Sequence, residues 1–394
     1  MKKISDIFGF YLPKKWRRFY IYLPLNLILF VVLFFLTVCI YSLSVNGEDY
    51  FSNVSIPKDV DLQFQFIHNS LIQANQTDDL DICKGYSSFC GNFIEWQYIF
   101  YTFYSMALYE LSKTQPSRIE FAKNDLDLCA RRILHLPEKA NPVEINKKLT
   151  TTNYGASSLM GGYYGVVLGL RKLVFQDSVF DVPLNNIIES LESQIEASLK
   201  HSTEFWTADQ ATQLYAIWLY DQATGSDHSQ LFNKWVNTME SRFIDDKSGL
   251  LISKITINPD DFVSVPRASS VSWTIIFLVD VYPDFVKKQY EALCNHREHS
   301  FGTFSFTSEF SRFFCFQPGD SDSGPLFFGV SPSATGFSLC SHKLFGNKKQ
   351  FTNYLRTFEV FACAKKNSDG KRYRLGNLMG DAILLYGKIA APRF

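Results

Sequence analysis

The chain has 394 residues, with 39 basic and 39 acidic side chains and a formal net charge of zero. This balance carries no electrostatic signature of a nucleic-acid partner, so we expect none. The part beyond residue 50 is long enough to form one large domain. Aromatic residues make up 16% of the chain, and we expect most of them to fill a hydrophobic core.

An apolar run without a charged side chain extends from Phe19 to Val45. It exceeds the roughly 20 residues needed to cross a membrane and the roughly 7–15 of a signal-peptide core. Small residues at 42 and 44 would permit cleavage, but the length favours a retained signal-anchor in contact with membrane lipid. Six basic residues precede the run, whereas Glu48 and Asp49 follow it. The charge asymmetry predicts a single-pass membrane protein with a cytoplasmic N-terminus and a periplasmic or extracellular main domain.

Beyond the run, apolar residues recur with helical spacing and strand-like alternation is scarce. We expect a basic cytoplasmic segment (1–18), a transmembrane anchor (19–45), a linker with the first helix (46–94) and a helical domain (95–394). The predicted helices are Val60–Ala74, Glu95–Lys113, Arg118–Leu136, Gly155–Val174, Leu184–Lys200, Thr207–Ala223, Ser229–Phe243, Arg267–Val281, Phe285–His299, Pro332–Leu344, Gln350–Ala362 and Leu375–Ile389.

Sequential helices of this kind bury their apolar faces as stacked antiparallel hairpins, in an open solenoid or a closed ring. No fixed short repeat is visible, which favours the ring. In helix number and order, about residues 60–394 resemble the (α/α)-toroid class. That class includes six-hairpin glycosidases, polysaccharide lyases and linalool dehydratase-isomerase-like proteins. The resemblance implies a mostly α fold of about six hairpins, with minor β pieces in loops. No catalytic signature of those families matches residue for residue, so the resemblance is one of architecture.

The cysteines of the exported part could form a disulfide in an oxidising compartment, and their spacing does not predict a metal centre. Cys83 and Cys90 are separated by six residues, a loop that a disulfide could close. The exported cysteines are odd in number, so at least one thiol should stay free. Cys294, His296 and His299 form one ligand-like cluster, but it lies at the end of a predicted helix, where histidines also suit the helix dipole. Since no CxxC occurs, we expect neither a metal site nor a cofactor.

The first polar patch runs from Trp206 to Gln222. Residues 207 and 210 have the spacing of a capping box, so a helix should begin here with Asp209 in its first turn. Asp209, Gln213 and Tyr220 share a helical face, with Trp206 nearby. A carboxylate, an amide, a phenol and an indole together could bind a sugar by hydrogen bonds and stacking, so binding or catalysis competes with simple capping.

The second patch, Val265 to Phe285, contains Arg267 directly before an apolar helix. Its guanidinium is placed to pair with a carboxylate at the same end of the bundle. The serines that follow are ordinary helix-capping residues, and no GxSxG motif surrounds them, which argues against a serine-hydrolase elbow. Trp273 in this helix, and Tyr154 before a glycine-rich segment, are further candidates for substrate binding.

The third patch, Gln317 to Phe337, is a loop rich in Gly, Ser and Pro that carries Asp320 and Asp322. Asp in such loops commonly bonds the local backbone. Two acids one residue apart, followed by glycines that permit close approach, favour a functional role. Calcium could use these oxygens, but the EF-hand spacing is absent. Glu95 and Glu309 are weaker candidate acids.

The leading interpretation is a membrane-anchored extracytoplasmic enzyme acting on a glycan, of hydrolase or lyase type, with paired carboxylates drawn from Asp209, Asp320 and Asp322. An inverting hydrolase would hold two carboxyl groups about 6.5–9.5 Å apart. Two alternatives stay open. One is a non-catalytic glycan-binding or assembly subunit with partners in a membrane complex, and the other is a dehydratase or isomerase for a hydrophobic small molecule. P-loop, Rossmann and HExxH motifs are absent from the sequence, so NTPase, dinucleotide and zincin functions lack support.

Overall fold

The computed structural model describes residues 14–52, 56–83, 86, 94–139, 157–201, 204–255, 265–311, 319–320 and 322–394. The chain divides into two compact units, Met1–Val45 and Asn46–Phe394. In the first unit, the described residues form helix α1 (Lys14–Leu43). The stretch Asn26–Phe51 contains an 18-residue window with a mean hydropathy of 2.7, and by length and composition it could cross a membrane.

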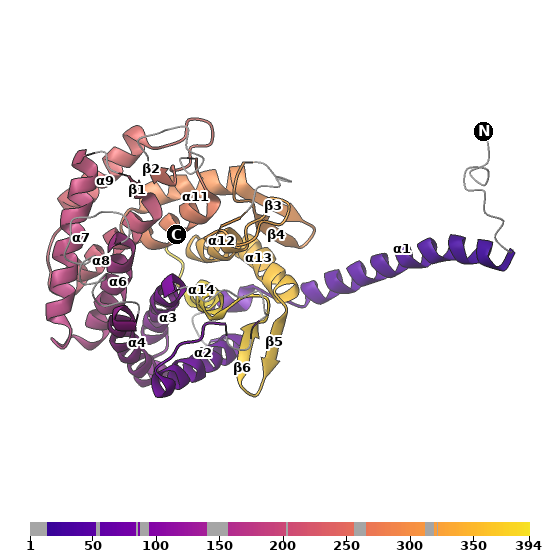
Figure 1. Ribbon diagram of the computed structural model, residues 1–394, viewed down its shortest axis with the longest axis horizontal. Coiled ribbons are helices and arrows are strands. Elements are labelled where there is room, and N and C mark those ends of the chain that lie inside the picture. Colours follow the sequence, from indigo (N-terminus) through magenta and orange to yellow (C-terminus); the bar gives the residue numbers. More distant parts are fainter. Residues whose placement is uncertain are drawn as a thin grey trace. The chain divides into compact units, whose positions relative to one another are not determined.

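The second unit is mostly helical, and its helices form two concentric layers (Figure 1). Each inner helix packs against the next, and α14 packs against α3, which closes the ring. The inner helices are α3 (Ile94–Thr114), α6 (Ser157–Phe175), α8 (Thr207–Thr224), α10 (Ala268–Leu278), α12 (Pro332–Leu344) and α14 (Leu378–Ile389). The outer helices are α2 (Lys58–Thr77), α4 (Ile119–Lys139), α7 (Asp181–His201), α9 (Ser229–Arg242), α11 (Pro283–Arg297) and α13 (Lys348–Phe361). The predicted fold class, an (α/α) toroid, is confirmed.

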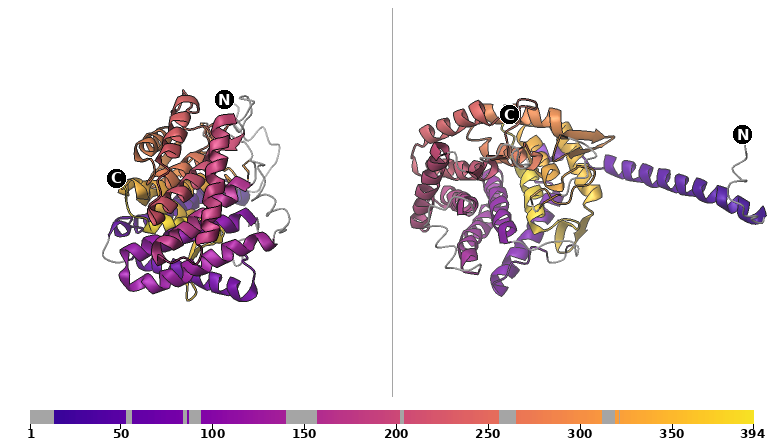
Figure 2. Two further views of the ribbon diagram at one scale, coloured as in Figure 1. Left: turned by 90° about the vertical axis from the view of Figure 1, so that its left-hand side faces the viewer. Right: turned by 45° about the horizontal axis from the view of Figure 1, so that its top comes forward.

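Inner and outer helices alternate along the chain, and this order fixes the direction in which the inner helices run. Because an outer helix returns the chain after each inner one, the inner helices all begin at the same end of the ring. Figure 2 shows the same helices from two further directions. The positive ends of the inner-helix dipoles therefore gather at one face, which favours negative charge there.

Aromatic side chains fill the centre of the ring, and all six inner helices contribute to them. The ring of Phe103 lies 5.4 Å from Trp273, 6.1 Å from Phe337 and 5.9 Å from Tyr386 between centroids. We call this cluster the aromatic plug; its members are Phe103, Tyr163, Tyr215, Trp273, Phe277, Phe337 and Tyr386. Each large ring buries enough apolar surface to contribute about 2 kcal/mol or more. The abundance of aromatic residues in the sequence is thus partly explained by core packing.

Close helix packing between α6 and α8 depends on glycine. A Cβ added at Gly165 would lie 2.7 Å from the Ala216 Cβ, and one at Gly162 would lie 3.2 Å from a Thr212 methyl carbon. A Cβ at Gly165 would not fit without movement of α8, and one at Gly162 would be tight, so the glycines allow the two backbones to approach. This contact matters for the site because α8 carries Asp209.

The strands form three small antiparallel pairs: β1 (Phe205–Trp206) with β2 (Lys254–Ile255), β3 (Glu298–Phe301) with β4 (Phe304–Thr307), and β5 (Ala364–Asn367) with β6 (Gly370–Tyr373). Short 3₁₀ turns lie at Glu48–Phe51 (η2) and Pro116–Arg118 (η3). The pairing of β1 with β2 joins the segments that lead into α8 and α10. Residues 298 and 299, predicted to end a helix, instead begin β3.

Two sequence-based expectations stay predictions. The first is the boundary at residue 95, although α2 packs against α14 and β6 in the ring. The second is the Cys83–Cys90 disulfide, because Cys90 lies outside the described residues. At least one free thiol was expected, and the structure contains free Cys129, Cys294, Cys340 and Cys363.

Candidate functional site

Asp209 lies in the first turn of α8, where the predicted capping box does not form. The residue before the helix makes no side-chain capping bond. Thr207 Oγ1 instead donates to the Ile252 and Ser253 carbonyls at 3.0 and 3.1 Å. Gln210 accepts a 2.7 Å bond from the Trp235 indole. Tertiary contacts therefore hold this helix start, and Asp209 has no hydrogen-bond or ion-pair partner within the part of the chain that the structure describes.

The Asp209 carboxyl group has a strongly perturbed pKa. Burial among protein atoms is the main cause, and the charges of Asp322 and Glu95 add to it; together they raise the pKa to about 8. The side chain still keeps part of its surface accessible to solvent. Burial and like charge both disfavour the ionised form, so Asp209 is protonated near neutral pH. A protonated carboxyl group that solvent can reach is able to donate a proton.

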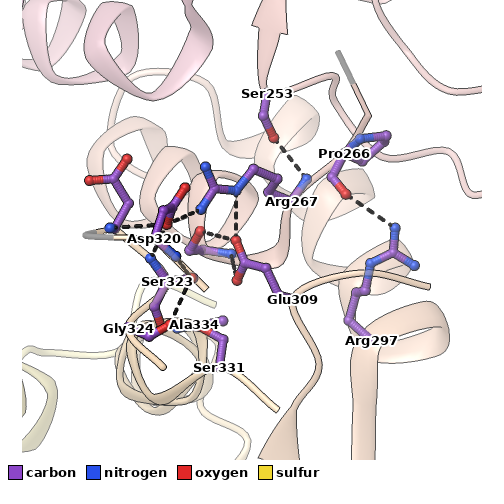
Figure 3. A network of polar contacts seen from close by, with 12 residues as sticks. Ser253, Pro266, Arg267, Arg297, Glu309, Asp320, Ser323, Gly324, Ser331 and Ala334 are labelled. Atoms are coloured by element: carbon purple, nitrogen blue, oxygen red, sulfur yellow. Dashed lines mark hydrogen bonds and ion pairs between the residues drawn. The ribbon is translucent and has the colours of Figure 1, made fainter. Parts of the chain in front are cut away.

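Arg267, directly before α10, is buried and pairs with two acids (Figure 3). Its Nε donates to Glu309 Oε1 at 2.8 Å, and its Nη2 donates to Asp320 Oδ1 at 2.8 Å. Glu309 is fully buried and also accepts a 2.5 Å bond from Ser269 Oγ. The Glu309 carboxylate thus sits at the start of α10, where the serine side chains were expected to cap. The pairing of Arg267 with a carboxylate agrees with the sequence-based expectation.

The Asp320 carboxylate organises its own loop. Besides the Arg267 bond, its Oδ1 accepts from the backbone N–H groups of Asp322 at 3.1 Å and Ser323 at 2.9 Å. Desolvation opposes ionisation, but hydrogen bonds from Arg267 and Ser323 and the arginine charge outweigh it and lower the pKa of Asp320. Gly324 and Gly329 have φ of +68° and +86°, a region that other residues rarely adopt, so the tight loop requires them.

Asp322 differs from Asp320 in its electrostatics. Desolvation raises its pKa, and the charge of Asp320 raises it further against the opposing effect of Arg267. Its side chain is nevertheless exposed to solvent. Two aspartates one residue apart therefore have pKa values shifted in opposite directions, which is the separation that acid–base catalysis uses.

Tyr163 connects the carboxylates with the aromatic plug. Burial raises its pKa, and the charges of Asp209, Asp322 and Glu95 raise it further, so these three acids are close enough to influence its hydroxyl. Its ring lies 6.1 Å from that of Trp273. We call Glu95, Asp209, Glu309, Asp320 and Asp322 the carboxylate cluster. It gathers at the end of the ring where the inner helices begin.

The other predicted binding residues divide into two groups. Trp206 lies beside the cluster, with the Arg267 guanidinium 5.9 Å from its ring centroid. Gln213 is buried beside Gly162, and its Nε2 has no hydrogen-bond partner in the described chain. Trp273 belongs to the plug and donates to Thr212 at 2.8 Å. The structure places these three around or beneath the cluster.

Tyr220 and Tyr154 are not brought to the cluster. Tyr220 is eleven residues further along α8 than Asp209, about 16 Å along the helix axis, and packs against His228. Sharing a helical face did not bring the two together. Tyr154 lies outside the described residues.

Sequence reasoning undervalued three members of the site. Glu95 and Glu309 were only weaker candidates, and Tyr163 was not a candidate. Glu95 had a usable signal, because an acid in the first turn of a helix can mark a site at the positive end of a ring of helix dipoles. Glu309 had none, since its partner Arg267 is 42 residues away in the chain.

A cavity of about 790 Å³ lies elsewhere, between α2 and the β5–β6 hairpin. Arg372, Asp79 and Gln73 are among its lining residues, but no member of the carboxylate cluster is. We place the candidate site at the cluster because several carboxyl groups with perturbed pKa values converge there, and such convergence is typical of functional sites.

The fold and the site define a helical toroid with a carboxylate cluster around a buried arginine at one end of its inner ring. No protein-family model matches the chain, and no curated protein matches it either. Among solved structures, the chain is similar to a GH76 α-mannanase of Bacteroides thetaiotaomicron, with 10% identity and a TM-score of 0.46. That similarity covers 82% of this chain and 95% of the other, and at this level it concerns architecture only.

Proposed function

We propose that this protein is a membrane-anchored hydrolase that cleaves glycosidic bonds by acid–base catalysis at the carboxylate cluster. The observation that carries the proposal is that two aspartates of the cluster differ in protonation state. Asp209 is protonated near neutral pH, while Arg267 holds Asp320 ionised. Glycosidases need one carboxyl group to protonate the leaving oxygen and one carboxylate to act as base or nucleophile.

In this mechanism Asp209 is the general acid, because its pKa of about 8 keeps its proton available at working pH. Asp320 is the ionised carboxylate, oriented by Arg267 and by two backbone N–H groups. Asp322 lies next to it, exposed to solvent, and its charge helps to raise the pKa of Asp209. Trp206, whose ring lies 5.9 Å from the Arg267 guanidinium, places an indole beside the cluster that a sugar ring can contact.

The anchor in the proposal is α1. Large apolar side chains on its described part, such as Leu27, Phe30 and Ile40, are 62%, 65% and 69% exposed. A surface of this kind is costly in water and is stabilised in lipid. The basic residues before it orient the N-terminus to the cytoplasm. The carboxylate cluster would then work outside the cytoplasm on a glycan of the cell envelope or surroundings.

The test is a turnover assay on a panel of oligosaccharides with Asp209→Asn and Asp320→Asn variants. Loss of a general acid or base lowers the rate by about 10²–10⁴-fold. Assays on two kinds of substrate distinguish the general acid from the base, because hydrolysis of aryl glycosides with good leaving groups needs no proton donor. We expect Asp209→Asn to retain activity on such a substrate, and Asp320→Asn to lose activity on both.

The matched control is Asp369→Asn, which changes an exposed turn aspartate in the β5–β6 hairpin. It should leave turnover unchanged. The proposal is wrong if the purified chain binds glycans without turning them over, or if both cluster variants keep full activity. Binding without turnover would support the alternative of a glycan-binding subunit.

A further inference from the structure

A second cluster of ligand-type side chains lies apart from the carboxylates, where α11, β3 and α12 meet. Cys294 is in the last turns of α11, Glu298 begins β3, and His342 is in α12. One ligand atom from each of these three residues lies within 4.8 Å of the other two. The His342 side chain is fully buried and that of Glu298 is 6% exposed.

The closest pair in this cluster does not form a hydrogen bond. His342 Nε2 and Glu298 Oε1 are 2.7 Å apart, yet neither atom has a partner with hydrogen-bond geometry in the described chain. Buried polar atoms are nearly always satisfied, so two unsatisfied atoms at this distance require an explanation. Without a partner, both atoms would be removed from water with no hydrogen bond in return, which destabilises the folded chain.

The other imidazole nitrogen is engaged. His342 Nδ1 lies 2.9 Å from the Tyr290 hydroxyl, which also accepts a 3.0 Å bond from Asn347 Nδ2. If Nδ1 donates its proton to Tyr290, the lone pair of Nε2 faces the Glu298 carboxylate. Two acceptors this close repel, so the contact requires either a proton on Nε2 or a cation that both atoms bind from one side. A hydrogen bond from the other nitrogen that fixes the histidine tautomer is also the usual support of a metal-binding histidine.

From this geometry we infer that Cys294, Glu298 and His342 bind a zinc ion. The ligand types indicate the metal. A thiolate, an imidazole and a carboxylate are typical ligands of Zn²⁺, whereas Ca²⁺ and Mg²⁺ prefer oxygen ligands alone. Three protein ligands leave a fourth tetrahedral position for water. Such a site joins an outer helix, a hairpin and an inner helix, and so it would stabilise the ring where these elements meet.

This inference departs from the sequence analysis, which expected no metal. The two histidines near Cys294 in the chain, His296 and His299, are not the ligands. His299 Nε2 lies 3.1 Å from Ser308 Oγ instead. The third ligand comes from a residue 48 positions beyond Cys294, which only the packing of α12 against its neighbours reveals. The inference is independent of the proposed hydrolase activity.

The first test loads the full chain in detergent with Zn²⁺ alone, removes excess metal and measures zinc by mass spectrometry. We expect about one zinc per chain, and a melting temperature that falls when a chelator removes it. Cys294→Ser and Glu298→Gln should retain little zinc. Cys363→Ser and Glu291→Gln are matched controls on exposed residues outside the cluster, and they should bind zinc as the unmutated chain does.

The second test replaces zinc by Co²⁺ in the unmutated chain, so it does not depend on whether a variant folds. A thiolate ligand gives a charge-transfer band in the near ultraviolet, and tetrahedral coordination gives intense visible bands. Absence of these bands, or a zinc content well below one per chain, would overturn the inference and leave an ion pair between His342 and Glu298. Equal zinc retention by Cys294→Ser and the unmutated chain would also overturn it.

Discussion

Replacement of Asp209 by asparagine should change how the stability of the protein depends on pH. The Asp209 pKa is raised from 3.8 to about 8 in the folded chain. Between these values the unfolded state is ionised and the folded state holds its proton. Stability contributed by this group therefore falls as pH rises through that window, and the full penalty is present above about pH 8. Asparagine keeps the size of the side chain and does not ionise.

The size of the effect follows from the pKa difference. Each pKa unit corresponds to about 1.4 kcal/mol. For a fully desolvated group, the free energy of unfolding would therefore change by about 4 kcal/mol between about pH 5 and pH 8. Asp209 keeps part of its surface accessible, and solvent screening reduces this figure. We expect Asp209→Asn to gain about 1–2 kcal/mol over the unmutated chain between pH 5 and pH 8.

The assay is urea unfolding of both proteins in detergent, followed by tryptophan fluorescence at several pH values. The relevant quantity is the change with pH in the difference between the two free energies of unfolding. Any constant cost of the amide, such as its own desolvation, cancels in this comparison. Parallel pH profiles for the two proteins would refute the reasoning, because they would mean that Asp209 ionises as an ordinary exposed aspartate does.

Four further predictions concern the carboxylate cluster, its loop and the anchor. Arg267→Met should lower the free energy of unfolding by about 3–5 kcal/mol, because it leaves the buried Glu309 charge unpaired; the double variant with Glu309→Gln should recover part of this loss in the same urea assay. Gly329→Ala should lower the free energy of unfolding by about 1–2 kcal/mol, because φ is +86° at this position. An unchanged urea midpoint would contradict this prediction. Turnover should fall above about pH 8, as Asp209 loses its proton, and also in acid, as Asp320 gains one; a flat pH–rate profile would exclude this pair. A reporter fused after Val45 should be active only outside the cytoplasm, and cytoplasmic activity would reverse the proposed orientation.

Local sequence patterns predicted the elements of this fold well. Apolar periodicity placed the ring helices to within a few residues, because a helix that packs on one face must repeat its apolar positions with the helical period. The helix predicted to start at Pro332 does start there, and Ser331 caps it, because its Oγ accepts from the Ala334 N–H at 3.0 Å. Capping by Thr207 failed because its hydroxyl finds tertiary partners, which a four-residue pattern cannot reveal.

The chemistry of the carboxylates was decided by the tertiary structure. The sequence identified Asp209, Asp320 and Asp322 as candidates, but it treated them alike. Their pKa values diverge because burial and Coulomb effects depend on distances between residues far apart in the chain. Arg267 stabilises the charge of Asp320 across 53 residues, whereas burial and the like charges of Asp322 and Glu95 oppose ionisation of Asp209.

The sequence by itself thus determined the apolar N-terminal helix, the helical content and the loop in which two aspartates occur, since each depends on residues close together in the chain. Closure of the ring by α14 against α3, the aromatic plug, and the pairing of His342 with Glu298 were decided only by tertiary packing. The physical reason is that desolvation, ion pairing and metal binding act through space, and the fold alone brings such residues within their range.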